Sequence, residues 1–289
     1  MIRPIAGLSE VASLFDGFIL DLWGVVHDGQ TPYPATIATL AALRKADKKT
    51  LLLSNAPRRA HALVTSMAAM GIGRDLYGEV LSSGEATRDA LIARTDGFFA
   101  GLGDKAFHLG PERDRSVFEG TSLSIVERVE DATCVINTGP HGFEDTVEMY
   151  RDILVAARAR DLPMVCANPD LVVIRAGRPV VCAGALAAEY AAMGGRVANR
   201  GKPDRAVYDA AVAQLGIADR KRVAVVGDAL ETDVRGANGA GLPAIWCTGG
   251  IHAAVLGVSY GVAAVPDEAE KLAFIHGVSV DFTIPGFFW

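Results

Sequence analysis

The chain has 289 residues, half of them apolar, so it is long enough for about two domains and its composition supports a large buried core. Its formal net charge of −6 argues against a protein that binds the phosphate backbone of nucleic acid, because such a protein needs a basic surface. No apolar stretch approaches the roughly 20 residues that a membrane-spanning helix requires, so we expect neither a nucleic-acid partner nor a membrane protein.

Near the N-terminus, short apolar runs that end in polar residues alternate with segments of helical periodicity. This alternation is typical of βαβ units and a mostly parallel sheet. The predicted strands here are 18–20, 50–53 and 80–81, and the predicted helices are 34–46 and 60–70. The residues that directly follow the three strands are Asp21, Ser54 and Ser82.

The middle of the chain differs, because its predicted strands do not end in acidic residues. These strands are 106–109, 134–137, 164–166 and 172–175. An amphipathic segment at 144–160 predicts a helix among them. We place an inserted α/β domain at residues 86–197.

The last part of the chain returns to the first pattern. Strands are predicted at 223–226 and 244–246, and helices at 204–215 and 232–240. Residues 1–85 and 198–289 are therefore expected to form one doubly wound α/β core with a mostly parallel, Rossmann-like sheet, to which residues 86–197 add a cap domain. The apolar tail 284–289 is expected to dock on this core or on a partner subunit.

The four cysteines indicate a reducing environment. Cys134, Cys166, Cys182 and Cys247 are well separated and form no C-x-x-C pair. This spacing favours buried, reduced thiols over a disulfide framework or a metal site. We therefore expect a cytoplasmic protein.

Polar side chains follow three of the predicted core strands, at the sheet edge where α/β proteins bind ligands. They are Asp21, the pair Ser54 and Asn55, and Asp228, while Lys202 lies just before a predicted helix. Carboxylates placed close together favour a cation between them, and oxygen ligands favour Mg²⁺. Taken singly, each residue is more simply explained as a turn, cap or surface residue, so the prediction depends on their joint placement.

Four segments occur in the order of the motifs of one enzyme family. They are 21–29 (DLWGVVHDG), 53–55 (LSN), 201–203 (GKP) and 227–233 (GDALETD). With these segments the sequence resembles the haloacid dehalogenase superfamily, specifically the class IIA group of NagD-like sugar phosphatases and pyridoxal phosphatases. The resemblance spans essentially the whole chain, and this class carries its cap between the second and third motifs.

The resemblance implies a magnesium-dependent phosphatase that acts on a small phosphorylated metabolite. Asp21 would attack phosphorus and form an aspartyl-phosphate. Mg²⁺ would be held by Asp21, the backbone carbonyl of Trp23 and Asp228, with Asp233 binding through water or from outside the ligand set.

The same resemblance assigns the remaining site residues. Ser54 and Asn55 would hold the transferring phosphoryl group, and Lys202 would neutralise the charge of the nucleophile and the phosphate. Asn168 and Asp170 belong to a cap segment similar to one in NagD-like members, so both are candidates for substrate selection together with Trp23. Class IIA relatives often dimerise through the cap, which makes a homodimer a further expectation.

Trp23 is the main departure from the family pattern. Phosphatases of the family carry an aspartate two residues after the nucleophile, as the acid that protonates the leaving oxygen. Because Trp23 stands there, two alternatives stay open: a non-catalytic protein that binds a phosphorylated ligand, and a hydrolase of a carbon–phosphorus or carbon–halogen bond. His27 and Asp28 follow closely in the chain, but a His-Asp-Gly sequence is typical of a turn, so we do not assign either as a replacement acid.

Overall fold

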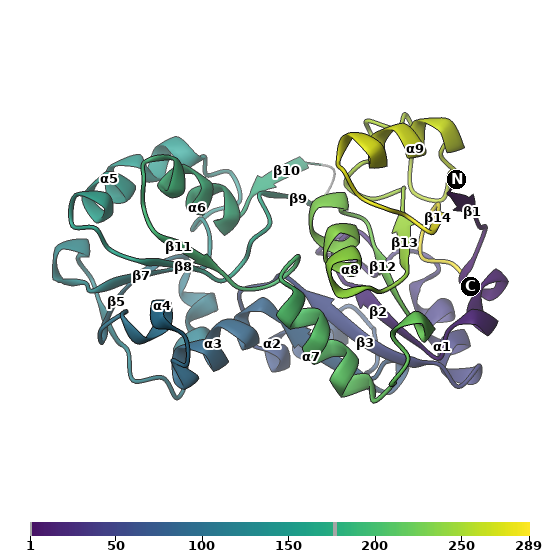
Figure 1. Cartoon of the computed structure of the whole chain (residues 1–289), viewed down its shortest axis with the longest axis horizontal. Helices are drawn as coiled ribbons and strands as arrows, with labels where there is room; N and C mark the ends of the chain where they lie inside the picture. Colours follow the sequence, from purple (N-terminus) through teal and green to yellow (C-terminus); the bar gives the residue numbers. More distant parts are fainter. Residues whose placement is uncertain (1, 176–177) are drawn as a thin grey trace.

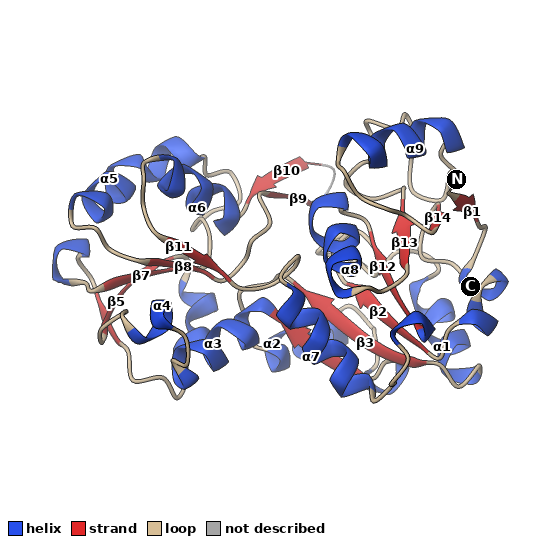
Figure 2. Cartoon of the chain, viewed as in Figure 1, coloured by secondary structure: helices blue, strands red, loops and turns tan. Residues whose placement is uncertain are grey.

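The computed structural model describes residues 2–175 and 178–289 of the chain. These residues form two lobes, each built on a parallel sheet with helices against it (Figure 1, Figure 2). The larger sheet has the strand order β1-β14-β13-β12-β2-β3-β4, and the smaller sheet has the order β11-β8-β7-β5-β6. A two-stranded antiparallel hairpin, β9–β10, lies between the lobes in this view (Figure 1).

The larger sheet combines strands from both ends of the chain. Its strands are β1 (Arg3–Pro4), β2 (Gly17–Asp21), β3 (Lys49–Ser54), β4 (Glu79–Ser82), β12 (Val223–Gly227), β13 (Ala244–Cys247) and β14 (Phe282–Ile284). The α-helices of this lobe are α1 (Thr36–Lys45), α2 (Ala60–Ala69), α7 (Arg205–Leu215), α8 (Arg235–Ala240) and α9 (Pro266–Ile275). All of these strands pair in parallel, which confirms the predicted α/β core.

The central strands β2 and β12 carry apolar side chains on both faces, because both faces of the sheet are buried. Side chains alternate across the sheet, so Ile19 and Val225 pack on one face with the apolar residues of α7 and α8. Their neighbours Leu20 and Val226 pack on the other face with α1 and α2. Helices on both faces are the expected partners of such a sheet and make the core doubly wound.

The smaller lobe contains the segment predicted as a cap. Its strands are β5 (Lys105–Leu109), β6 (Ser124–Val126), β7 (Cys134–Asn137), β8 (Met164–Cys166), β9 (Val172–Arg175), β10 (Arg178–Val181) and β11 (Val197–Asn199). Its α-helices are α4 (Gly97–Ala100), α5 (Arg151–Ala159) and α6 (Ala183–Ala192). This sheet too is covered on both faces, since Val135 and Met164 pack with α5 and α6, whereas Ile136 and Val165 pack with α4.

One helix joins the two lobes. Helix α3 (Ser83–Ala93) starts directly after β4, and its Ala86 packs against the core. Leu91, at the other end of α3, packs in the cap lobe. The helix therefore continues across the expected boundary at residue 86, while β11 extends to Asn199, two residues beyond the expected boundary at 197. The division into domains 1–85 with 198–289 and 86–197 stays a prediction.

Two helices differ from the expectation drawn from periodicity. The predicted helix 144–160 begins only at Arg151, because Asp145 accepts hydrogen bonds from the Gly142 amide and the Tyr150 hydroxyl and so forms a turn before it. The predicted helix 232–240 starts with a π-helical turn, Leu230–Val234, and becomes α-helical only afterwards. Single π-turns in helices frequently mark functional sites.

The apolar tail was expected to dock either on the core or on a partner subunit, and it docks on the core. Strand β14 pairs between β1 and β13, and Ile284 and Phe287 are fully buried. The Phe287 amide donates to the hydroxyl of Tyr260. The sequence analysis did not identify β1 or β14, since both strands are very short.

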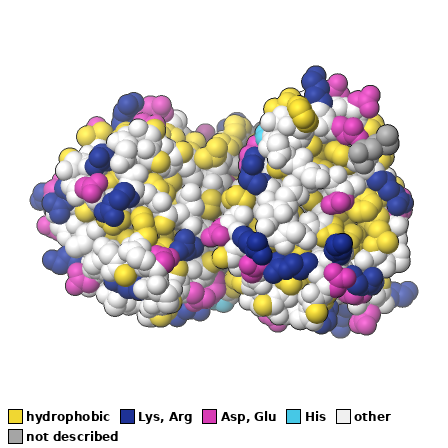
Figure 3. All heavy atoms as spheres, in the orientation of Figure 1, with side chains coloured by type: hydrophobic (Ala, Val, Ile, Leu, Met, Phe, Trp, Pro, Cys, Tyr) yellow, Lys and Arg dark blue, Asp and Glu magenta, His cyan; other side chains and the backbone are white. Residues whose placement is uncertain are grey.

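The four cysteines are buried and free, as expected. Among the residues that the structure describes, no helix is both long enough and apolar enough to cross a bilayer. Acidic and basic side chains are interspersed on the face shown in Figure 3, where the surface also narrows between the lobes.

Candidate active site

Three aspartates meet at the carboxyl edge of the larger sheet. Asp21 is the last residue of β2, and Asp228 follows the end of β12, the parallel neighbour of β2. Asp233 comes from the π-helical turn after β12. Carboxylate oxygens of the three residues lie within 4.8 Å of one another, and all three side chains are buried.

Lys202 lies within this carboxylate cluster. Its ammonium Nζ is 2.5 Å from Oδ1 of Asp21 and 2.8 Å from Oδ1 of Asp233, and the residue is only 3% exposed. Burial opposes its charge, but the two carboxylates outweigh this effect and raise the pKa of Lys202 well above its ordinary value. Lys202 is therefore a permanent cation that orients the Asp21 carboxylate.

The cluster has the charge and the ligands of a metal site. Burial, followed by the negative charge of Asp233, raises the pKa of Asp21 well above its usual range and that of Asp228 to about 7. A bound cation would favour the ionised forms, and three ionised carboxylates with one ammonium would leave two negative charges for one divalent cation to compensate. Oxygen ligands at this spacing fit a hard divalent ion such as Mg²⁺.

The loop after β13 completes the surroundings of Asp228, and the sequence analysis gave it no role. The Ile251 amide donates to Oδ2 of Asp228 at 2.7 Å. A Cβ on Gly250 would lie 2.2 Å from that oxygen, and one on Gly24 would lie 2.0 Å from it, so only glycine allows the backbone this close. Gly249 and Gly250, shortly after the predicted strand 244–246, are the sequence feature from which this loop could have been predicted as part of the site.

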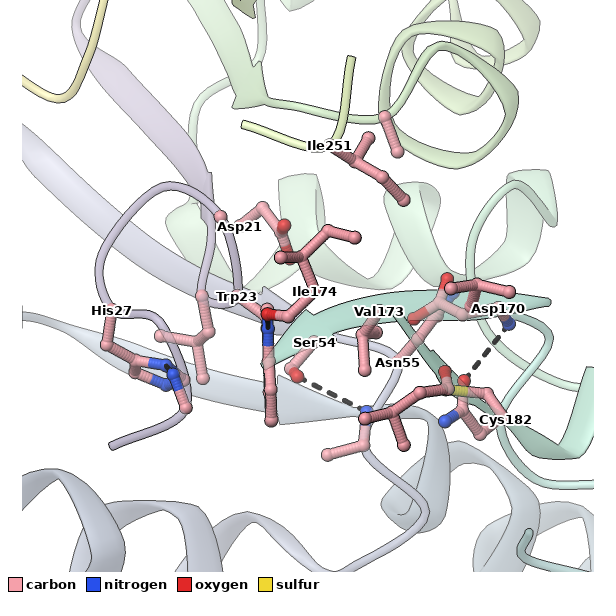
Figure 4. Close-up of a pocket in the computed structure, with 18 of the residues that line it drawn as sticks. Asp21, Trp23, His27, Ser54, Asn55, Asp170, Val173, Ile174, Cys182 and Ile251 are labelled. Atoms are coloured by element: carbon pink, nitrogen blue, oxygen red, sulfur yellow. Dashed lines mark hydrogen bonds between the residues drawn. The ribbon is translucent and has the colours of Figure 1, made fainter. Parts of the chain in front are cut away.

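Ser54 is the last residue of β3 and Asn55 follows it, and both line the pocket that contains Asp21 (Figure 4). Ser54 Oγ accepts from the Ala56 amide at 3.2 Å, which leaves its hydroxyl hydrogen able to donate to a ligand. The Asn55 side chain is already engaged: its Oδ1 accepts from the Lys202 amide, and its Nδ2 donates to the Lys202 carbonyl and to Asp170. Asn55 thus fixes the backbone that carries Lys202.

Asn168 and Asp170 connect the cap lobe to this site. Asn168 Oδ1 accepts from the Asp170 amide, which forms a turn, and Asp170 Oδ1 accepts from Asn55 Nδ2 at 2.8 Å (Figure 4). Burial raises the pKa of Asp170, while Lys202 opposes this rise. Both predicted specificity residues therefore make structural contacts at the junction of the lobes.

A single cavity of about 540 Å³ contains the whole constellation. Its walls include all nine residues singled out by sequence: Asp21, Trp23, Ser54, Asn55, Asn168, Asp170, Lys202, Asp228 and Asp233. Much of the remaining wall is apolar, from both the core and the hairpin β9–β10, and it includes Met67, Phe143, Val173 and Ile251. A volume of this size suits a small-molecule ligand.

One corner of the cavity is polar, and sequence analysis did not identify it. Arg58, in the loop after β3, approaches the buried carboxylate of Asp114 from the cap lobe, with 3.5 Å between Nε and Oδ1. Burial raises the pKa of Asp114 to about 6. Arg113 lines the same cavity and lies over the ring of Phe143.

His27 and Asp28 form the turn that their sequence predicts. Nδ1 of His27 accepts from the Gly29 amide, and burial lowers the pKa of His27 to about 4, so this imidazole is neutral at pH 7. Oδ1 of Asp28 accepts from the amides of Gln30 and Thr31. Both side chains accept hydrogen bonds from amides of the turn, so we assign neither as a replacement acid.

Comparison with known proteins agrees with this geometry. The family described as haloacid dehalogenase-like hydrolase matches residues 18–124, and a second family of similar hydrolases matches residues 199–270. The crystal structure of a haloacid dehalogenase-like hydrolase from Brucella suis 1330 is 32% identical, with a TM-score of 0.84, over 98% of this chain and 99% of the other. The chain belongs to the haloacid dehalogenase-like hydrolases.

Two further comparisons, one with a curated sequence and one with a solved structure, carry more specific descriptions. D-Glycerol 3-phosphate phosphatase of Mycobacterium tuberculosis is 28% identical over 256 residues, which cover 86% of this chain and 67% of that protein. A glycerol phosphate phosphatase from the same organism has been crystallised with magnesium and is 25% identical, with a TM-score of 0.64, over 85% of this chain and 72% of the other. The class IIA resemblance drawn from the four motifs is thereby confirmed.

Proposed function

We propose that this member of the family is a phosphohydrolase that transfers the phosphoryl group of a small phosphate ester to Asp21 and then to water. The observation that carries this proposal is the position of the Lys202 ammonium, which is buried against Asp21 and Asp233 beside Asp228. A carboxylate fixed by a cation at the floor of a cavity is a suitable nucleophile for phosphorus. The descriptions of the mycobacterial relatives support the same reaction class.

The reaction has two displacements. In the first, an Asp21 oxygen bonds to phosphorus while the bond from phosphorus to the leaving oxygen breaks, and the leaving group takes the electron pair. In the second, water bonds to phosphorus, the bond to Asp21 breaks, and phosphate and a proton are released. Lys202 stabilises the charge of the nucleophile, and Ser54 and the backbone at Asn55 bind the phosphoryl oxygens.

The three aspartates would hold Mg²⁺, with the backbone carbonyl of Trp23 as a further ligand. Bound there, the ion supplies charge stabilisation at the phosphoryl oxygens. Asp21 and Asp228 are the direct ligands in this proposal. Asp233, which already accepts from Lys202 and from the Ala229 amide, acts through water or as a support.

The apolar cavity and the tryptophan at position 23 indicate which esters react fastest. The indole N–H of Trp23 is too weak an acid to protonate a leaving oxygen, and a general acid typically contributes about 10²–10⁴-fold. Esters whose leaving group needs little protonation, such as aryl and acyl phosphates, should therefore react disproportionately fast. Asn168 and Asp170 help to select among them from the cavity wall.

The test is phosphate release from aryl and alkyl phosphates with and without Mg²⁺. Turnover should require the metal and stop on addition of EDTA. Asp21→Asn should abolish it with the fold intact, because the amide keeps the shape but is not a nucleophile. Asp228→Ala should raise the magnesium concentration needed for half-maximal rate. Binding of phosphate esters without any turnover would instead support a non-catalytic binding protein.

We also propose a cytoplasmic location and a homodimer formed through the cap. The buried free thiols support the first, since such thiols persist in a reducing compartment. Exposed apolar side chains in the cap lobe, Met149 at 66% and Val155 at 51%, support the second. Sedimentation of wild type and of Met149→Glu tests the dimer, which the charged side chain should dissociate.

A further inference from the structure

Trp23 contacts the cap hairpin directly, although it belongs to the loop that carries the nucleophile. Its indole Nε1 donates to the backbone carbonyl of Ile174 in β9 at 2.6 Å. The two residues are 151 positions apart in the sequence. Figure 4 shows the indole beside Asp21 with its nitrogen directed at this strand.

The carbonyl of Ile174 is available because of the hairpin's composition and position. Pro179 stands opposite Ile174 in the register of β9 and β10, and proline has no N–H to donate. The hairpin has only these two strands among the described residues, so no further strand supplies a donor. The indole N–H of Trp23 is the donor that this carbonyl accepts.

The indole itself is held by the core. A Cβ on Gly29 would lie 2.3 Å from two ring atoms of Trp23, so the ring packs directly on the glycine backbone. The His27 ring meets the Trp23 ring edge to face, with centroids 5.8 Å apart. Contacts with the turn that follows the nucleophile therefore hold the Trp23 ring, and with it the direction of the indole N–H.

The hairpin forms part of the cavity wall over the nucleophile. Val173, Ile174 and Val180 line the same cavity as Asp21. We propose that Trp23 is a positioning residue: its indole N–H fixes the hairpin as an apolar wall against which the leaving group of the substrate packs. The substrate class that fits this wall is a phosphate monoester with an apolar, preferably aromatic, leaving group, an assignment that rests on the proposed function.

The experiment uses Trp23→Phe, which keeps an aromatic ring but removes the donor. Hydrogen–deuterium exchange of backbone amides in 172–175 and 178–181 should become about five- to tenfold faster, the effect of losing one hydrogen bond of ordinary strength. The KM for p-nitrophenyl phosphate should rise by a similar factor with kcat changed less than about twofold, because the wall binds substrate but does not touch the reacting atoms. Trp289→Phe, a matched substitution at the exposed C-terminal residue, should change neither quantity.

Ile174→Ala keeps the carbonyl and removes the apolar side chain. It should raise the KM while the hairpin amides exchange at the wild-type rate, and it keeps the inference testable if Trp23→Phe does not fold. Unchanged exchange in Trp23→Phe, or faster exchange with an unchanged KM, would overturn the positioning role. A wild-type protein without turnover on any phosphate ester would refute the proposed function, and the exchange measurement would still decide whether Trp23 holds the hairpin.

Discussion

At the scale of single residues, the proposed nucleophile Asp21 and the position usually held by the general acid differ in what they contact. Asp21 has a cation at hydrogen-bond distance, whereas the position two residues later carries an indole whose N–H is directed to the cap. The nearby turn residues His27 and Asp28 are occupied by backbone amides. The proposed nucleophile thus has a cation beside it, but no carboxylic acid stands at the usual place two residues later.

Trp23→Asp should restore part of the missing acid catalysis. We expect the ratio of kcat/KM for alkyl phosphates to that for aryl phosphates to rise at least about tenfold, below the full effect of a general acid because the substitution also releases the hairpin. Parallel assays of glycerol phosphate and p-nitrophenyl phosphate measure this ratio. If wild type already hydrolyses both at equal rates, another group serves as the acid.

At the scale of elements, the turn between β8 and β9 serves both the cavity and the junction of the lobes. Asn168 forms the turn through the Asp170 amide, and Asp170 accepts from Asn55, which in turn holds the Lys202 backbone. This chain of contacts links a cap loop to Lys202, the cation beside Asp21. A substitution in this turn is therefore expected to affect both the cap loop and the position of Lys202.

Asn168→Ala should alter substrate preference more than stability, because Asn168 lines the cavity and the loss of its hydrogen bond from the Asp170 amide costs about 1 kcal/mol. Relative kcat/KM over a set of phosphate esters should change severalfold, with Tm lowered by roughly 2–4 °C. A larger fall in Tm with unchanged relative rates would show that Asn168 is a turn residue alone.

At the scale of the whole molecule, the two lobes share one cavity. Buried titratable groups also make the stability of the folded protein depend on pH. His108 in β5 is 8% exposed, and its Nε2 lies 2.9 Å from the Thr138 hydroxyl. Burial, with a smaller contribution from the charge of Arg115, lowers the pKa of His108 to about 4. Between pH 6.5 and 4 the unfolded chain thus binds a proton at His108 that the folded protein does not bind.

The free energy of unfolding should therefore fall as the pH drops from 6.5 towards 4, by roughly 2–3 kcal/mol from this residue. His108→Gln should flatten this part of the curve, although it lowers stability at pH 7 by about 1 kcal/mol if the Thr138 contact weakens. Urea unfolding at several pH values measures both effects. The same substitution at the exposed residue His61, His61→Gln, serves as the matched control.

The sequence by itself determined the strands β2, β3, β4, β12 and β13 of the core sheet and the polar residues at their carboxyl ends. Apolar runs of strand length end at Asp21, Ser54 and Asp228, and these patterns are local, so they can be read without knowing where the chain goes next. Parallel neighbours then place their ends together, which brought the three positions to one cavity.

Only the tertiary structure decided how the cap closes this cavity. The contacts of Trp23 with Ile174 and of Asn55 with Asp170 join positions 151 and 115 residues apart. The amide of Ile251 reaches Asp228 from another strand's loop. Such contacts leave no periodic signal in the sequence, because each joins groups from segments that come together only when the chain has folded.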